Sequence, residues 1–198
     1  MALSLEGQPA ILDFATQHVY ALPNATPSNL SRLEWLDDSR VAYVMYPNFW
    51  SREFTLNFFD VADPQQPAHT LPNIMDYVLA PNQARAAVVS AEAITAVGPT
   101  LQGPLGLMPL EGGPITPLDL GAAPTWSPDG SQLAYLHGEI MPKNLAPDRR
   151  RIELRLADVS TGLTRTLFSF AVLGPHDPTP FSSPVWSPDG KQVAIMAS

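Results

Sequence analysis

The side chains best suited to chemistry in this sequence are its few histidines and the acidic residues beside them. The chain has four histidines, which are His18, His69, His137 and His176. Their spacing matches neither His-x-His nor His-Glu-x-x-His, patterns that place two imidazoles on one metal ion. Acidic residues follow two of them, Glu139 after His137 and Asp177 after His176. Because imidazoles and carboxylates bind zinc and transfer protons, these pairs predict, as one hypothesis, a small hydrolytic or metal-dependent site.

Other catalytic groups are missing from the sequence. The chain has no Cys, which excludes disulfides, thiolate metal sites and a cysteine nucleophile. It also lacks Gly-x-Ser-x-Gly, the motif that presents the serine of α/β-hydrolases. Gly112-Gly113 is too short for a phosphate-binding loop. We therefore predict a protein that is not an enzyme and that has no catalytic residue, metal or cofactor.

Composition and charge narrow the class of protein further. The 198 residues are 45% hydrophobic, enough for a sizeable core, and their formal net charge is −8. Nucleic-acid binding depends on clustered cations, so we expect no nucleic-acid partner. Arg149-Arg150-Arg151 fits a solvated strand edge or an anion site. The sequence contains no apolar stretch near the roughly 18 residues of a membrane span, so we expect neither a membrane span nor a signal peptide. The compartment is left open.

A ten-residue phrase occurs twice and decides the architecture. Trp126–Tyr135 and Trp186–Ile195 share the pattern Trp-Ser-Pro-Asp-Gly-x-Gln-apolar-Ala-apolar. A Pro-Asp-Gly turn between apolar runs predicts a tight β-hairpin, because Asp accepts backbone hydrogen bonds and Gly takes a positive φ. Weaker copies start at Trp35 and Leu79. The four starting positions lie 44, 47 and 60 residues apart, and the first two spacings match a four-stranded propeller blade.

A second phrase lies between these copies and completes each unit. It is an apolar strand that ends at an aspartate, a turn and another strand; it is clearest at Leu156–Leu167 and returns at Ile11–Leu22. Each unit then has four short antiparallel strands, so we predict an all-β propeller of about four blades in one domain, residues 1–198. The predicted blades are approximately residues 33–72, 76–119, 124–168, and 184–198 together with 1–22.

The anchor and turn residues of the repeat receive a structural interpretation. We expect the tryptophans to pack between neighbouring blades, since burial of an indole removes roughly 150–250 Å² from water. The residues assigned this role are Trp35, Leu79, Trp126, Asp129, Gly130, Trp186, Asp189 and Gly190.

Function is expected in the loops that depart from the repeat. In a propeller, the long loops predicted at residues 23–31, 47–53, 91–103, 137–150 and 169–183 all open on one rim, which indicates a partner or ligand there. An apolar rim would favour a protein partner, and converging acids and histidines would favour an enzyme. The apolar candidates include Phe170 and Phe181. The candidate binding residues are Phe49, Trp50, Arg52, His137, Glu139, Arg149, His176 and Asp177.

The repeated phrase at 126–135 and 186–195, with its Asp-ending strand, resembles the repeat of TolB-type β-propellers. The same repeat occurs in the non-catalytic propellers of prolyl oligopeptidase and dipeptidyl peptidase relatives. The resemblance implies a scaffold that binds a protein or peptide in the periplasm or envelope of a bacterium. A propeller that gates a separate serine peptidase is a further alternative that it implies.

Blade number is where this sequence departs from that family, whose members usually have about six or more blades. Four blades leave three interpretations: a small closed ring, a fragment of a larger ring, or half of a ring that a second copy completes. The complementary ends of the chain favour a ring, and a homodimeric ring would use the same ends.

Overall fold

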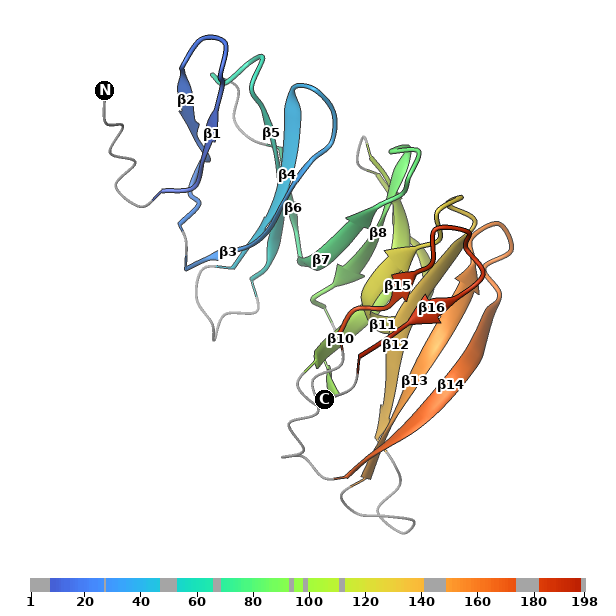
Figure 1. Cartoon of the computed structure of the whole chain (residues 1–198). Coiled ribbons are helices and arrows are strands. Elements are labelled where there is room, and N and C mark those ends of the chain that lie inside the picture. The colour runs from blue at the N-terminus through green and yellow to red at the C-terminus, as the bar shows by residue number, and fades with distance from the viewer. Residues whose placement is uncertain are drawn as a thin grey trace. The chain divides into compact units, whose positions relative to one another are not determined.

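The computed structural model in Figure 1 describes residues 8–26, 28–46, 53–65, 69–92, 95–97, 100–110, 113–140, 149–173 and 182–196. Every regular element in these ranges is a β-strand and the strands pair antiparallel, so the predicted all-β fold is confirmed. The chain folds as two compact units, Met1–Asp76 and Tyr77–Ser198, which are described separately. No helix capable of crossing a bilayer occurs in the described ranges.

The first unit contains a two-stranded and a four-stranded sheet. Its strands are β1 (Ala10–Leu12), β2 (Val19–Ala21), β3 (Leu30–Trp35), β4 (Arg40–Met45), β5 (Thr55–Asp60) and β6 (His69–Pro72). β1 pairs with β2, and the order of the larger sheet is β3-β4-β5-β6. β4 is buried from Val41 to Val44, as its continuous apolar sequence predicts. The buried core on one face of β4 consists of Ile11, Leu22, Ala25, Val41, Tyr43 and Phe59.

The second unit contains most of an eight-stranded sheet and a final hairpin. The sheet is formed by β7 (Ile74–Leu79), which begins in the first unit, and by β8 (Arg85–Ser90), β9 (Thr95–Val97), β10 (Thr100–Pro109), β11 (Thr116–Trp126), β12 (Gln132–Ile140), β13 (Arg149–Asp158) and β14 (Thr164–Leu173). Its order is β14-β13-β12-β11-β10-β8-β7, with β9 beside β10. β15 (Val185–Trp186) and β16 (Val193–Ala194) form a separate two-stranded sheet.

The long strand β11 joins two repeat units without a loop. Its first part pairs with β10, and from Ala122 to Trp126 it pairs with β12 instead. Ala123, next to this change of partner, has a φ of 49°, in the left-handed region. A side chain at Gly121 would bring a Cβ within 2.6 Å of the Tyr135 ring. The absence of a side chain at this position therefore lets β12 pass closely where β11 changes sheets.

The turn between β11 and β12 shows why the repeat has its sequence. The Ser127 N–H donates to Gln132 O, and the Gly130 N–H donates to Ser127 O with Gly130 at a φ of 71°. The Ser127 hydroxyl donates to Asp129 Oδ1 at 2.6 Å. This hydrogen bond, with those from Ser131, lowers the pKa of Asp129 to about 2. Each residue of the Ser-Pro-Asp-Gly run except the proline thus makes or allows a bond that closes the turn.

The same turn recurs in other copies of the phrase. Between β15 and β16, Ser187 and Gly190 make the equivalent backbone bonds, and Asp189 accepts from the Ser187 hydroxyl at 2.6 Å. In the weaker copy between β7 and β8, the Gln83 N–H donates to Ala80 O, and Gln83 takes the positive φ of 54° in place of glycine. The geometry of the turn therefore persists where the sequence has diverged.

Each intact phrase also links its tryptophan to the preceding repeat. The Trp126 indole N–H donates to Val78 O at 2.9 Å, and the Trp186 indole N–H donates to Thr125 O at 3.2 Å. The acceptor in both cases is the residue immediately before the anchor of the preceding copy, Leu79 or Trp126. The two tryptophans therefore occupy equivalent places between neighbouring repeats.

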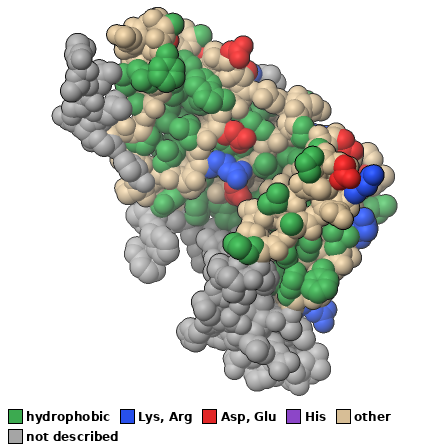
Figure 2. Space-filling view, viewed as in Figure 1, with side chains coloured by type: hydrophobic (Ala, Val, Ile, Leu, Met, Phe, Trp, Pro, Cys, Tyr) green, Lys and Arg blue, Asp and Glu red, His purple; other side chains and the backbone are tan. Residues whose placement is uncertain are grey.

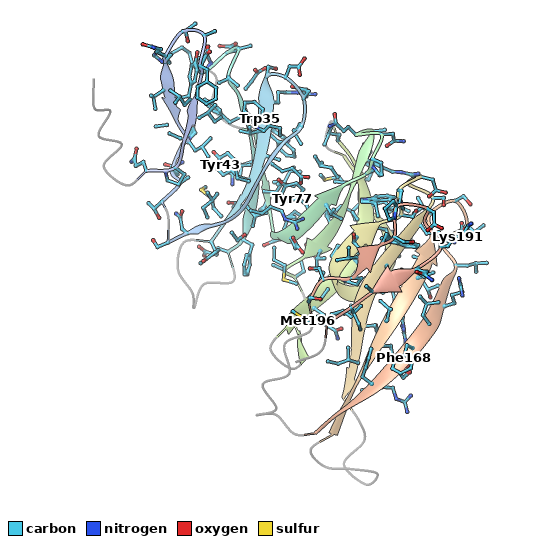
Figure 3. All side chains as sticks on the ribbon, in the orientation of Figure 1. Trp35, Tyr43, Tyr77, Phe168, Lys191 and Met196 are labelled. Carbon is cyan, nitrogen blue, oxygen red and sulfur yellow. The ribbon has the colours of Figure 1, made fainter. Side chains whose placement is uncertain are left out.

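The first copy differs because its tryptophan is exposed. Trp35, labelled in Figure 3, lies at the end of β3 and is 50% exposed. It stands opposite Val41 of β4, so both side chains lie on the same face of the sheet.

The strands predicted to share the fourth blade are present as two hairpins. β1 pairs with β2 and β15 pairs with β16, and the two pairs are separate two-stranded sheets. A joint blade, and with it one propeller domain over residues 1–198, stays a prediction.

We expect Trp126→Ala to lower the free energy of unfolding of the second unit by about 3–5 kcal/mol, because it empties a buried aromatic site. Trp126→Phe, which keeps most of the ring but loses the bond to Val78, should cost less. Urea unfolding followed by circular dichroism measures both changes. A loss below about 1 kcal/mol for Trp126→Ala would show that the indole contributes little to packing.

Candidate functional site

Most of the candidate rim residues lie outside the described residues. This holds for Phe49, Trp50, Arg52, His176, Asp177 and Phe181. Glu139 and Arg149 lie at paired positions of β12 and β13, opposite Arg151 and Leu173, and only their backbone is described. His137 is therefore the one member of the candidate binding set whose side chain is described.

His137 lies in a strand and is buried, although the sequence predicted a loop there. Its side chain is in β12, the residue is 8% exposed, and Nδ1 is 2.8 Å from Leu120 O. Pairing of β12 with β13 continues through Ile140, so residues 137–140 lie in a strand and not in the predicted loop. Gln102 explains the continuation, because its side-chain amide exchanges two hydrogen bonds of 2.9 Å with the backbone of Gly138. At this end of the sheet β11 pairs with β12 only as far as Ala122. Beyond that residue, the Gln102 amide takes the place of β11 as the hydrogen-bond partner of the β12 backbone.

A cluster of charged side chains lies beside His137 on the same sheet. Arg155 is central: its Nη1 is 3.0 Å from Asp119 Oδ2, and its Nε donates to Glu153 Oε2 at 2.7 Å. The Tyr135 hydroxyl donates to Asp119 Oδ2 at 2.6 Å, and the Thr166 hydroxyl donates to Glu153 Oε2 at 3.0 Å. We call Asp119, Tyr135, Glu153, Arg155 and Thr166 the Asp119–Arg155 cluster.

Alternation along the strands places this cluster on one face. Tyr135 is opposite Arg155, and His137 is opposite Glu153. The intervening residues Leu154 and Leu136 point to the other face, where they form an apolar core. The alternating run Ile152–Leu156 predicted a half-covered strand, and from it Glu153 and Arg155 could be placed on one face. The pairing of Arg155 with Asp119 could not be predicted from this run, because it depends on how β11 crosses between sheets.

The charges of the cluster stabilise one another. Burial alone would raise the pKa of Asp119. Hydrogen bonds from Tyr135, the Leu120 N–H and Arg155 lower this pKa by more than burial raises it, so it is below the usual value. Burial also raises the pKa of Glu153, but its hydrogen bonds with Arg155 and Thr166 lower this pKa by more, so it too is below the usual value. Burial, and then the hydrogen bond to Asp119, raise the pKa of Tyr135. At neutral pH the cluster therefore holds two carboxylates, one guanidinium and a neutral phenol.

This arrangement serves to join strands. Its bonds connect β11, β12, β13 and β14 through mutual donors and acceptors. Within the described ranges, no group of three His, Cys, Asp or Glu side chains could hold a metal ion, and no buried side-chain nitrogen or oxygen lacks a hydrogen-bond partner. The cluster fits a polar clamp between repeats better than a reactive centre, which needs a group free to engage a substrate.

Exposed apolar side chains mark a different candidate surface, on β14. This strand is the last in the order of the eight-stranded sheet. Phe168, labelled in Figure 3, is 58% exposed, and its ring meets that of Phe170 edge-to-face at 4.6 Å. Leu163 and Leu167 are exposed on the same strand or just before it. We call Leu163, Leu167, Phe168 and Phe170 the β14 patch.

A second exposed apolar surface lies on the last hairpin. A shallow hollow of about 550 Å³ is lined by Val185, Trp186, Ser187, Gln192, Val193 and Ala194. Val185 is 61% exposed and Met196 is 63% exposed. Figure 2 shows hydrophobic side chains at the surface over both parts of the chain.

The Asp119–Arg155 cluster predicts a loss of stability in acid. Asp119 and Glu153 bind protons more weakly in the folded chain than in the unfolded one. Their stabilisation is complete above the unfolded pKa values, about 4, and is lost as pH falls through the lower folded values. We expect Asp119→Asn to flatten the fall in unfolding free energy between about pH 6 and pH 3, whereas Glu92→Gln on an exposed position should not. Urea titrations across this range test it; equal slopes for all three proteins would contradict it.

Comparisons with known proteins identify the fold. No family model matches the chain, and no curated protein matches it. Among solved structures, the tricorn protease aligns with a TM-score of 0.61 at 15% identity, over 96% of this chain and 17% of that one. A TolB-like protein of Agrobacterium tumefaciens aligns with a TM-score of 0.54 at 17% identity, over 95% of this chain and 64% of that one. Acylaminoacyl peptidase of Pyrococcus horikoshii aligns with a TM-score of 0.52 at 13% identity, over 84% of this chain and 27% of that one.

These proteins are longer than the chain, which spans less than two thirds of each. Identity below about one fifth carries the fold and nothing finer. With the repeated turns and the tryptophan bonds between repeats, the comparisons establish that this chain has the fold of TolB-type β-propellers.

Proposed function

We propose that this chain is a non-catalytic propeller scaffold that binds a protein or peptide partner. The observation that carries the proposal is the aromatic pair on the last strand of the sheet, in which Phe168 is 58% exposed and its ring contacts the partly buried Phe170. The TolB-type fold supports it, because the propellers that this chain resembles are non-catalytic scaffolds. The same resemblance extends the proposal to a bacterial periplasm or envelope.

The β14 patch has the properties of a peptide-binding edge. Aromatic side chains with apolar neighbours are enriched where partners bind, because their burial removes a large apolar area from water. A strand at the end of a sheet can also accept an extended peptide as a further strand. Ser169 separates Phe168 from Phe170, so the two aromatic side chains lie on the same face of β14. An extended peptide with apolar side chains at alternate positions fits this edge.

We extend the proposal to the rim residues predicted from the sequence, with each unit considered by itself. In the first unit the candidates are Phe49, Trp50 and Arg52. In the second unit they are Glu139 in β12, Arg149 in β13, and His176 and Asp177 in the segment after β14. The ring of His137 is buried, so it is not part of the proposed surface.

A propeller that serves a serine peptidase is a second candidate. It is favoured by the alignment with the tricorn protease and with acylaminoacyl peptidase, whose names describe peptidases. If the natively expressed chain co-purifies with a protein that reacts with a fluorophosphonate probe, it serves a serine peptidase. If no such protein co-purifies with it, the chain is an independent scaffold.

We expect peptides selected on this chain from a displayed random library to depend on the β14 patch. Phe168→Ser should weaken binding of a selected peptide about tenfold or more, the effect expected when an aromatic anchor is removed from an interface. Because Phe168 is exposed, the same change should lower the unfolding free energy by only about 1 kcal/mol. Isothermal titration and urea unfolding provide the two measurements.

Phe14→Ser is the matched control, since Phe14 is an even more exposed phenylalanine in the other unit. It should leave peptide affinity unchanged. If Phe168→Ser and Phe14→Ser bind the selected peptides equally well, the β14 patch is not the binding surface.

A further inference from the structure

The two phenylalanines of the β14 patch lie on the apolar side of the sheet. Phe168 stands opposite Leu154 of β13, and Phe170 stands opposite Ile152. Both β13 residues belong to a buried apolar cluster. Residues that stand opposite one another in antiparallel strands point to the same side of the sheet. Phe168 and Phe170 therefore share the side on which this cluster lies.

An irregularity in β14 brings a cation to the same side. In a regular strand, residues three apart point to opposite faces. The register of β13 and β14 shifts at Leu167, which has no opposite residue on β13, as in a β-bulge. Arg165 consequently stands opposite Leu156, a further member of the apolar cluster. Arg165 and Phe168 thus share a face although they are three residues apart.

These side chains of β14 have the spacing of an extended peptide. Their partners on β13 are the alternate residues 152, 154 and 156. Alternate residues of a strand are about 6–7 Å apart. An extended peptide that lies along β14 would therefore present its own alternate side chains at the same spacing. We call Arg165, Phe168 and Phe170 the arginine–aromatic row.

The row is open at one end and packed at the other. Within the described strands, β14 is the last of its sheet, and residues 163–169 are all exposed. Phe168 is 58% exposed. Phe170 is partly buried and packs on the same apolar cluster as Trp186. The row therefore offers an exposed cation and an exposed ring that continue into a supported apolar surface.

The hairpin that carries the row is cationic in a chain that is acidic overall. Residues 149–173 contain five arginines and two acidic residues, a formal charge of +3, whereas the whole chain has −8. One of the two acids, Glu153, lies between Ile152 and Leu154 and so points away from the row. Arg151 and Arg155 form their ion pairs with Glu153 on that other side.

Arg165 is the charge that the row presents to a partner. It is exposed on the apolar side, and the second acid of the hairpin, Asp158, is engaged at the turn. Asp158 Oδ1 accepts hydrogen bonds from the Ser160 and Thr161 hydroxyls. A guanidinium binds a carboxylate through two parallel hydrogen bonds, which gives the contact both strength and direction. An acidic side chain is the complement of this position.

We propose that the arginine–aromatic row binds an extended, acidic segment of a partner protein. The segment has the pattern acidic-x-apolar-x-apolar along β14, or its reverse where the chain runs the other way. Its carboxylate pairs with Arg165, and its two apolar side chains cover Phe168 and Phe170. The inference rests on the proposed function and deepens it, because it names the class of peptide that the β14 patch accepts.

A protein segment is favoured over a nucleic acid. Arginine and aromatic side chains also bind single-stranded nucleic acid, but such sites need a groove of cations that follows several phosphates. The row has one cation, Arg165, and the chain is acidic overall. A single-stranded oligonucleotide therefore enters the test as a competing ligand.

The composition of selected peptides is the first test. Short random peptides displayed on phage are selected on the parent chain, and clones that also bind Phe168→Ser are removed. We expect the retained peptides to be enriched, relative to the unselected library, in Asp or Glu two positions from an apolar residue. Retained peptides without this enrichment would contradict the proposal.

Arg165→Gln measures the charge pair directly. It should weaken binding of a retained acidic peptide about fivefold, as expected for an ion pair near the surface. It should weaken binding less than about twofold when the acidic residue of the peptide is replaced by its amide. Isothermal titration of both peptides on both proteins completes the cycle. Because Arg165 is exposed, the urea midpoint should stay at the parent value.

Gln83→Glu is the matched control, since it changes the net charge of the chain by the same amount as Arg165→Gln. Gln83 is exposed in the turn between β7 and β8, and β7 is at the opposite end of the sheet order from β14. The change should leave affinity for the acidic peptide as it is in the parent. An equal loss in both variants would show that net charge, and not the row, sets the affinity.

The outcomes separate this inference from the proposed function. Peptides that depend on Phe168 but bind Arg165→Gln as tightly as the parent would overturn the inference and leave the proposed function standing. A selection that yields no peptide dependent on Phe168 would overturn both. Displacement of the peptide by oligothymidine, with a loss of oligothymidine binding in Arg165→Gln, would make the row a nucleic-acid site instead.

Discussion

The second unit depends on one hydrogen bond that recurs between its repeats, the bond from an anchor tryptophan to the strand of the preceding copy. A buried indole N–H needs an acceptor, and the carbonyl ahead of the preceding anchor provides it for Trp126 and for Trp186. The acceptor of one bond, Thr125, is next to the donor of the other, Trp126. The two bonds are therefore consecutive, and they join the copies of the phrase that begin at Leu79, Trp126 and Trp186.

Burial and charge then divide the faces of the sheet. Between β12 and β14 one face is apolar and packs on Trp186, Val193 and Ile195. The opposite face carries the Asp119–Arg155 cluster, in which Asp119 comes from the part of β11 that belongs with β10. Apolar packing thus joins the repeat to its successor, and a clamp of charged groups joins it to its predecessor. Like the tryptophan bond, both contacts join neighbouring repeats through side chains.

The sequence was sufficient for the features that are local. The Ser-Pro-Asp-Gly phrase predicted the turns, and the apolar run from Val41 predicted a strand buried on both faces. It was insufficient where distant residues decide. The strand continues past Gly138 because Gln102, far away in sequence, bonds its backbone, and His137 is therefore buried in a strand. The pairing of Arg155 with Asp119 likewise follows from how β11 crosses between sheets, which no local pattern contains.

Hydrogen exchange of the indole N–H groups tests the tryptophan bond most directly. Nitrogen-15 NMR resolves these groups, and single Trp→Phe variants assign them among the four tryptophans of the chain. The account predicts slow exchange at Trp126 and Trp186, whose indoles are bonded to strand carbonyls, and fast exchange at Trp35 in dilute solution. Exchange at Trp126 and Trp186 as fast as at Trp35 would contradict it.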